Sequence, residues 1–205
     1  MQACCERVFG SDSLDGKTVA VQGPDAVGHK IVAQLHEHST RVVVSDIDPQ
    51  KVKDISAGFA VDAVAAEAIY DVKCDVFCPC ALGKVINDDT LGRLKCKIIC
   101  GCANNQLAEE HNGDQLEKQG LVYAPDYITN AGGTIYDTDR LGVGGVSHER
   151  GREKVYRIFD NMQRVFEIAD RDGIPTYRAA DRMAEERIRR IAEVKKYVDD
   201  LNPTF

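Results

Sequence analysis

A glycine-bounded turn early in the chain has the residue types and spacing that bind a dinucleotide. The segment Val21-Gln22-Gly23-Pro24-Asp25-Ala26-Val27-Gly28 follows a short apolar run, and Asp46 lies 18 residues beyond Gly28, at the end of the next such run. In such a turn, glycine lets the backbone approach the pyrophosphate, and an acidic residue after the second strand accepts hydrogen bonds from ribose hydroxyls. Asp46 therefore favours NAD over NADP, whose extra phosphate it would repel.

Asp25 occupies the middle position of this turn, where a second glycine is usual. A carboxylate there would lie near the pyrophosphate at the positive end of the following helix, and like charges at close range repel each other. The side chain could instead turn outward and cap the helix, as Asp commonly does at a helix N-terminus. The sequence leaves both orientations open, and with them the strength of cofactor binding.

The elements that must position these residues alternate along the chain. Strands are predicted at residues 18–22, 41–45, 74–77, 97–100 and 121–124, and helices between the first three at residues 26–38 and from Pro49 toward Gly58. Continuous apolar strands separated by helices imply a parallel sheet covered on both faces. The predicted fold class is therefore α/β, a Rossmann-like doubly wound parallel sheet.

The last quarter of the chain contains two amphipathic helices and no strand. One is predicted from Ser147 to Asp170, with apolar residues spaced by three and four, and the other from about Thr176 to Leu201. We predict a dinucleotide-binding domain at residues 1–146 and a helical segment at 147–205 that packs on it. The alternative is that the apolar stripes form an interface with a missing partner.

Composition excludes several classes of protein. The 205 residues contain 26 Lys and Arg against 33 Asp and Glu, with no Trp, so nucleic acid is not an expected partner. No apolar run approaches the roughly 18 residues that span a membrane, and Glu6 and Arg7 stand where a signal peptide would be apolar. We expect a cytoplasmic protein with reduced cysteines and no membrane partner.

Six of the eight cysteines form two similar groups. Cys74, Cys78 and Cys80 have the spacing C-x3-C-x-C, and Cys96, Cys100 and Cys102 repeat it on the next predicted strand. Equal parity places each trio on one face of its strand, so four thiolates could bind zinc or an iron–sulfur cluster, or two could form a redox pair. The alternative, which we favour, is that they are small buried apolar residues and that no metal is bound.

Seven motifs together resemble one known family. They are Gly23 to Asp46, Cys74-Asp-Val-Phe-Cys-Pro-Cys-Ala-Leu-Gly83, Ile86-Asn-Asp-Asp-Thr90, Gly101-Cys-Ala-Asn-Asn-Gln-Leu107, Tyr123-Ala-Pro-Asp-Tyr127, Asn130-Ala-Gly-Gly133 and Ala179-Ala-Asp-Arg-Met-Ala-Glu-Glu-Arg187. In this order they are similar to the C-terminal cofactor domain of the leucine, phenylalanine and tryptophan dehydrogenases. The resemblance covers nearly the whole chain and implies an NAD-dependent oxidoreductase that deaminates an L-amino acid to a 2-oxo acid.

The resemblance also implies roles for individual residues. The turn Gly23 to Gly28 would flank the pyrophosphate, with Asp46 at the adenine ribose and Cys80 and Ala81 near the nicotinamide ribose. Asn104 would be the amide near the nicotinamide and the substrate carboxylate, and Asn130 opens a turn at the same cleft. The cofactor-binding set predicted is Gly23, Asp25, Ala26, Val27, Gly28, Asp46, Ile47, Cys80, Ala81, Asn104 and Asn130. For the asparagines, the alternative is turn geometry, because Asn tolerates left-handed backbone.

The family's catalytic lysines belong to an N-terminal domain with a Gly-Gly-Gly-Lys segment, which these residues do not contain. By resemblance, residues 1–16 are the helix and linker that precede the cofactor domain. We therefore expect a truncated dehydrogenase that is not catalytic alone, whose partners are a dinucleotide and either a missing catalytic domain or further copies of itself. The alternative is a non-catalytic Rossmann-like binding or interaction module with weakened cofactor binding.

Overall fold

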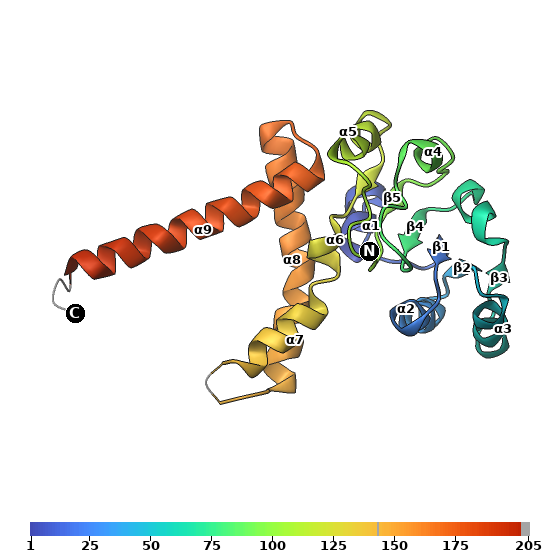
Figure 1. Cartoon of the computed structure of the whole chain (residues 1–205), viewed down its shortest axis with the longest axis horizontal. Coiled ribbons are helices and arrows are strands. Elements are labelled where there is room, and N and C mark those ends of the chain that lie inside the picture. Colours follow the sequence, from blue (N-terminus) through green and yellow to red (C-terminus); the bar gives the residue numbers. More distant parts are fainter. Residues whose placement is uncertain (143, 202–205) are drawn as a thin grey trace.

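The computed structural model describes residues 1–142 and 144–201 and contains a parallel sheet of six strands in the order β3-β2-β1-β4-β5-β6 (Figure 1). The strands are β1 (Thr18–Gln22), β2 (Arg41–Ser45), β3 (Asp62–Ala63), β4 (Val76–Pro79), β5 (Ile98–Ile99) and β6 (Val122–Tyr123). Because the direction of winding reverses between β1 and β4, the sheet is doubly wound, as predicted. Such sheets bind ligands at the carboxyl ends of the strands beside the reversal.

Helices cover both faces of the sheet (Figure 1). They are α1 (Gln2–Phe9), α2 (Ala26–Glu37), α3 (Pro49–Gly58), the 3₁₀ helix η1 (Ala66–Asp71), α4 (Asp88–Leu91), α5 (Glu110–Lys118), α6 (Asp126–Thr129), α7 (Gly132–Arg140), α8 (His148–Asp172) and α9 (Thr176–Leu201). Strand side chains alternate between two cores: Val19 and Val21 pack with α1, α2, α3 and α8, whereas Ala20 packs with η1, α4 and α5. Burial of both faces explains the continuous apolar strands.

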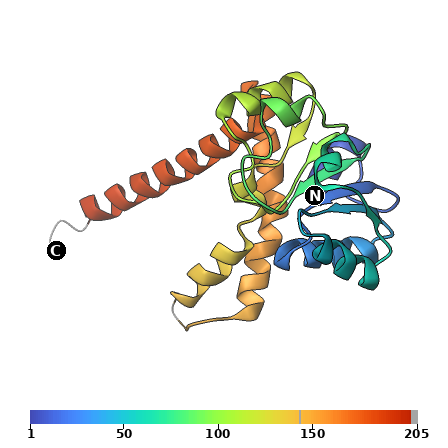
Figure 2. The ribbon, with the colours of Figure 1, turned by 45° about the vertical axis from the view of Figure 1, so that its right-hand side comes forward.

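The C-terminal helices differ in how they pack. Met162, Val165 and Phe166 of α8 are buried in the same core as α1, and Arg7 of α1 donates two hydrogen bonds of 2.5 Å to Asp170. In contrast, the buried residues of α9 among residues 176–197 lie near its start, and the helix then extends away from the sheet (Figures 1 and 2). Within the described residues, no helix has the length and apolar character needed to cross a membrane.

The three cysteines of each group do not lie on one face of their strand. The prediction that their even spacing would place them on one face is therefore wrong. Cys74 and Cys96 pack in the core that contains Phe77, whereas Cys78 and Cys100 lie in the opposite core. Cys74 and Cys96 precede the regular strands, which begin at Val76 and Ile98. In the second segment the carbonyl of Asp75 also accepts hydrogen bonds from the backbone N–H groups of both Lys97 and Ile98, so the alternation is irregular there. Over residues 1–142 and 144–201, no three Cys, His, Asp or Glu side chains gather in a way that could hold a metal ion.

A buried carboxylate joins α7 to α8. Asp139 is 2% exposed and accepts hydrogen bonds from Arg150 (Nε, 2.6 Å), Lys154 (Nζ, 2.9 Å) and the backbone N–H of Ser147 (3.1 Å). Hydrogen bonds from Arg150 and then Lys154 hold the pKa of this carboxyl well below its usual range. The ionised group therefore stabilises the fold above the unfolded-state pKa of about 4, and the stabilisation is lost as the pH falls.

We expect Asp139→Asn to lower the melting temperature by roughly 5–10 °C at pH 7, because one partner of a buried ion pair is removed. The difference in melting temperature between Asp139→Asn and the unmodified protein should become smaller as the pH falls from about 5 to about 3. Thermal melts followed by circular dichroism test this. Asp137→Asn is the control, because Asp137 is exposed and its ion pair with Arg140 is long, at 3.7 Å. A difference that does not change with pH would contradict the electrostatic role of Asp139.

Candidate functional site

The turn after β1 is tight and pressed against the loop after β4. Gly23 has a positive φ of 85°, and its N–H donates to the carbonyl of Ser45 at 2.8 Å. A Cβ added at Gly23 would lie 2.6 Å from the Cβ of Ala81, and one added at Gly28 would lie 2.3 Å from the carbonyl oxygen of Gly23. Glycine at both positions therefore lets the turn close over the carboxyl end of the sheet.

Asp25 adopts the capping orientation. Its Oδ1 accepts from the N–H of Ala26 at 2.9 Å, and its Oδ2 accepts from Nζ of Lys51, on α3, at 2.6 Å. The pKa of Asp25 is lowered, first by the Lys51 hydrogen bond and then by the Ala26 N–H, and the pKa of Lys51 is correspondingly raised. The sequence did not identify Lys51, since no motif connects it to the turn.

The carboxyl end of β2 carries the residues predicted for the adenine ribose. Asp46 is half-buried, and its Oδ1 accepts from the backbone N–H of Asp48 at 2.9 Å. Beside it, Ile47 is 87% exposed, and Val27 at the start of α2 is 55% exposed. Two apolar side chains therefore face solvent, one next to Asp46 in sequence and one at the start of α2.

The loop after β4 places Cys80 beside the thiols of Cys78 and Cys102. The backbone N–H of Cys80 donates to the carbonyl of Gln22 at 2.8 Å, so this loop is bonded directly to the end of β1. Hydrogen bonding to Cys102 lowers the pKa of Cys80, but the hydrogen bond with Cys78 and burial outweigh it, and the pKa lies above its ordinary value. The pKa of Cys102 is raised by its hydrogen bond to Cys80 and by burial. Because thiolates are the reactive form, these cysteines are poor nucleophiles.

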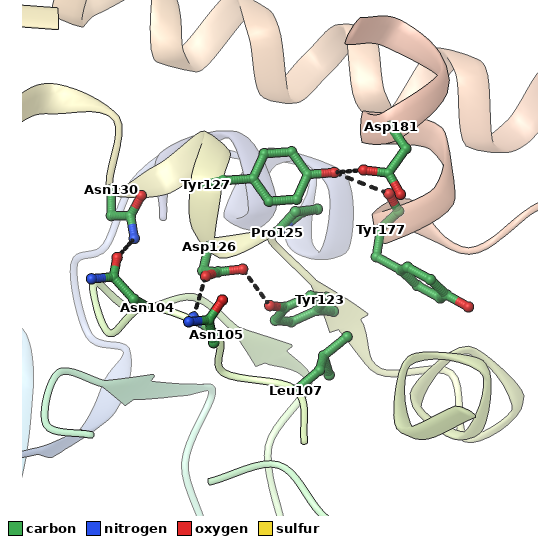
Figure 3. Close-up of a pocket in the computed structure, with 10 residues that line it drawn as sticks. All are labelled: Asn104, Asn105, Leu107, Tyr123, Pro125, Asp126, Tyr127, Asn130, Tyr177 and Asp181. Atoms are coloured by element: carbon green, nitrogen blue, oxygen red, sulfur yellow. Dashed lines mark hydrogen bonds between the residues drawn. The ribbon is translucent and has the colours of Figure 1, made fainter. Parts of the chain in front are cut away.

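The two predicted asparagines lie in the segments that follow β5 and β6, and they contact each other (Figure 3). Nδ2 of Asn130 donates to Oδ1 of Asn104 at 2.7 Å. Turn geometry explains Asn105, which has a φ of 51° and whose N–H donates to Asp126 at 2.5 Å, but it does not explain Asn104 or Asn130, because neither has a positive φ. No described residue accepts a hydrogen bond from Nδ2 of Asn104, which leaves that exposed amide as a donor.

A cavity of about 430 Å³ lies beside the asparagines (Figure 3). Among its lining residues, Tyr127 on α6 donates to Asp181 on α9 at 2.6 Å, and Tyr123 donates to Asp126 at 3.3 Å. Burial raises the pKa of Tyr123 and of Tyr127, so both phenols stay protonated. The Tyr123 to Tyr127 motif is part of the family resemblance, but the sequence predicts no role for its side chains.

Comparison with known proteins identifies the family. Residues 44–195 match the family described as glutamate/leucine/phenylalanine/valine dehydrogenase. The chain belongs to this family. It is 50% identical over 188 residues to leucine dehydrogenase of Thermoactinomyces intermedius, which covers 92% of the chain and 51% of that protein. Identity to leucine dehydrogenase of Bacillus subtilis is also 50%, over 93% of the chain and 52% of that protein.

A solved structure of the glutamate/leucine/phenylalanine/valine dehydrogenase family has the same architecture. The crystal structure of L-tryptophan dehydrogenase from Nostoc punctiforme superposes with a TM-score of 0.89 at 40% identity, over 92% of this chain and 56% of that one. The chain thus spans about half the length of the relatives it matches.

Within this family member, the predicted residues lie on consecutive strand ends. Asp46 and Ile47 follow β2, the turn Gly23 to Gly28 follows β1, and Cys80 and Ala81 follow β4. Asn104 follows β5, and Asn130 ends the short helix after β6. All eleven therefore border one edge of the sheet, in the spatial order β2-β1-β4-β5-β6.

Proposed function

We propose that this chain is the NAD-binding domain of an L-amino-acid dehydrogenase. The observation that carries the proposal is the row of predicted residues along the carboxyl edge of the sheet, centred on the reversal between β1 and β4. A dinucleotide is long enough to extend along several strand ends. The row of predicted residues starts at the carboxylate of Asp46 and ends at the paired amides of Asn104 and Asn130, which suits a dinucleotide with a ribose at one end and a carboxamide at the other. NAD would supply the acceptor for the hydride that leaves the amino acid.

The residues fit NAD in their chemistry. Gly23 and Gly28 let the turn pack closely against Ala81 and against its own backbone, as a pyrophosphate-binding turn requires, and the Asp46 carboxylate can accept hydrogen bonds from ribose hydroxyls. Exposed Ile47 and Val27 offer apolar surface to an adenine ring. The free Nδ2 of Asn104 can donate to a carboxamide or carboxylate oxygen without adding charge.

The names of the relatives support the choice of reaction, which is oxidative deamination of an L-amino acid to a 2-oxo acid. The Gly-Gly-Gly-Lys segment that the resemblance associates with substrate does not occur in these 205 residues. We therefore propose that this chain contributes cofactor binding, and that its partners are a dinucleotide and either a lysine-bearing domain or further copies of the chain.

A second candidate function is a non-catalytic binding module of the same fold. Asp25 favours it, because a carboxylate in the pyrophosphate turn weakens binding of a polyanion. The capping orientation of Asp25 and its ion pair with Lys51 favour the first candidate instead.

Calorimetric titration with NADH and NADPH separates the two candidates. We expect NADH to bind with a Kd near or below about 100 μM, equivalent to about −5.5 kcal/mol, and NADPH to bind more weakly. Asp46→Asn should narrow the preference for NADH, whereas Asp12→Asn, an exposed carboxylate in the loop after α1, should not. Absence of binding to either dinucleotide, by the natural chain and by Asp25→Gly, would contradict the cofactor-domain function.

A further inference from the structure

Lys51 forms an ion pair with Asp25 in the turn after β1, and it lies among carboxylates. Its Nζ is 2.6 Å from Oδ2 of Asp25, and Asp46 and Asp48 also act on it electrostatically. The side chains of Lys51 and Asp25 are 39% and 64% exposed, so the pair is at the surface of the edge where the dinucleotide would bind. Without Lys51, this end of the site would present three carboxylates.

Such an arrangement conflicts with binding a dinucleotide. Asp25 takes the position that is normally bare glycine beside the pyrophosphate, which is itself negatively charged. The N–H of Ala26 already donates to Oδ1 of Asp25, so part of the positive helix terminus is directed to this carboxylate rather than to a phosphate. A compensating positive charge is needed to make the turn compatible with the anion.

We propose that Lys51 is a cofactor-affinity determinant that neutralises Asp25 and holds its carboxylate away from the pyrophosphate. The inference rests on the proposed function, since it assumes that a dinucleotide binds this edge. The position of the lysine on α3 matters as well as its charge, because the Lys51 side chain reaches Asp25 at the start of α2 from the neighbouring helix. Lys53, two residues along on α3, is exposed and has no ion pair within 4 Å among the described residues.

The proposal separates Lys51 from a residue that binds the dinucleotide directly. If its role is to neutralise Asp25, removing the lysine should matter only while the carboxylate is present. If the ammonium itself binds the phosphate, removing it should weaken binding whether or not Asp25 is there. A double-mutant cycle between the two positions distinguishes these cases.

The test is titration of the full chain with NADH, using Lys51→Met, Lys51→Arg, Asp25→Gly, the double variant Asp25→Gly/Lys51→Met, and Lys53→Met as the matched control. We expect Lys51→Met to weaken binding about tenfold or more. Lys51→Arg should retain most of the affinity, and Lys53→Met should stay within about twofold of the natural chain. In the Asp25→Gly background, loss of Lys51 should cost no more than about threefold.

Thermal melts of each variant identify any that fails to fold, and an unfolded Lys51→Met is replaced by Lys51→Gln. Unchanged NADH affinity in Lys51→Met, or an equal loss in both backgrounds, would overturn the neutralising role and leave the proposed function standing. Binding by Asp25→Gly but not by the natural chain would also overturn it. If neither the natural chain nor Asp25→Gly binds NADH, the proposed function fails together with the inference.

Discussion

A Gly28→Val variant is expected to lose NADH binding and to melt roughly 5–10 °C below the natural chain. A Cβ at this position would lie 2.3 Å from the carbonyl oxygen of Gly23 and 3.3 Å from the Cβ of Cys80. The first of these atoms belongs to the backbone of the turn after β1, so the turn itself must move, and valine adds two further methyl groups. Overpacking of this kind costs about 1–3 kcal/mol, which for a chain of this length corresponds to several degrees.

Gly58→Val is the matched control, because Gly58 ends α3 and an added Cβ would meet no atom within 4 Å apart from its chain neighbours and its own helix backbone. Calorimetric titration with NADH gives the affinity of each variant, and a thermal melt gives its melting temperature. We expect at least a tenfold difference in affinity between them, since displacement of the turn changes the surface offered to the pyrophosphate. Equal NADH affinities would show that the turn can open without consequence and would remove Gly28 from the site.

The central strands could be predicted because a strand that is buried on both faces appears in the sequence as a continuous apolar run. Residues 18–22 and 41–45 were predicted from apolar runs and form β1 and β2 with those bounds. β3 was missed, because Asp62 and Ala63 are both exposed at the edge of the sheet and show no apolar pattern. The strands expected at 97–100 and 121–124 form only two residues of regular strand each.

Contacts between distant parts of the chain could not be predicted in the same way. Asp25 and Lys51 are 26 residues apart, and Tyr127 and Asp181 are 54 apart, so each pair depends on how two helices meet. The capping role of Asp25 was one of two open orientations, because a local signal identified the N-cap but not the lysine that fixes the second oxygen. The prediction that each cysteine trio lies on one face was wrong for a related reason. Side chains alternate between the two faces only while the strand stays regular.

The other large expected effect concerns Asn104. Because its Oδ1 accepts from Asn130, its Nδ2 is the group left to donate to a ligand. Asn104→Asp keeps the acceptor for Asn130 but replaces that donor with a negatively charged oxygen. We expect NADH affinity to fall about tenfold or more, as measured by calorimetry, with little change in melting temperature because the side chain is exposed. Asn161→Asp, an exposed site on α8, makes the same charge change and should have no effect.

Asn130→Asp tests whether Asn130 determines which atom of the Asn104 amide, Nδ2 or Oδ1, faces the ligand. A carboxylate at position 130 can only accept a hydrogen bond, so Asn104 must turn its Nδ2 toward it and leave Oδ1 to face a ligand. Although Asn104 itself is unchanged, the donor is lost, and NADH affinity should fall as in Asn104→Asp. If Asn104→Asp weakens binding and Asn130→Asp does not, Asn130 does not orient the amide. If neither variant changes the affinity, the amide pair lies outside the dinucleotide site.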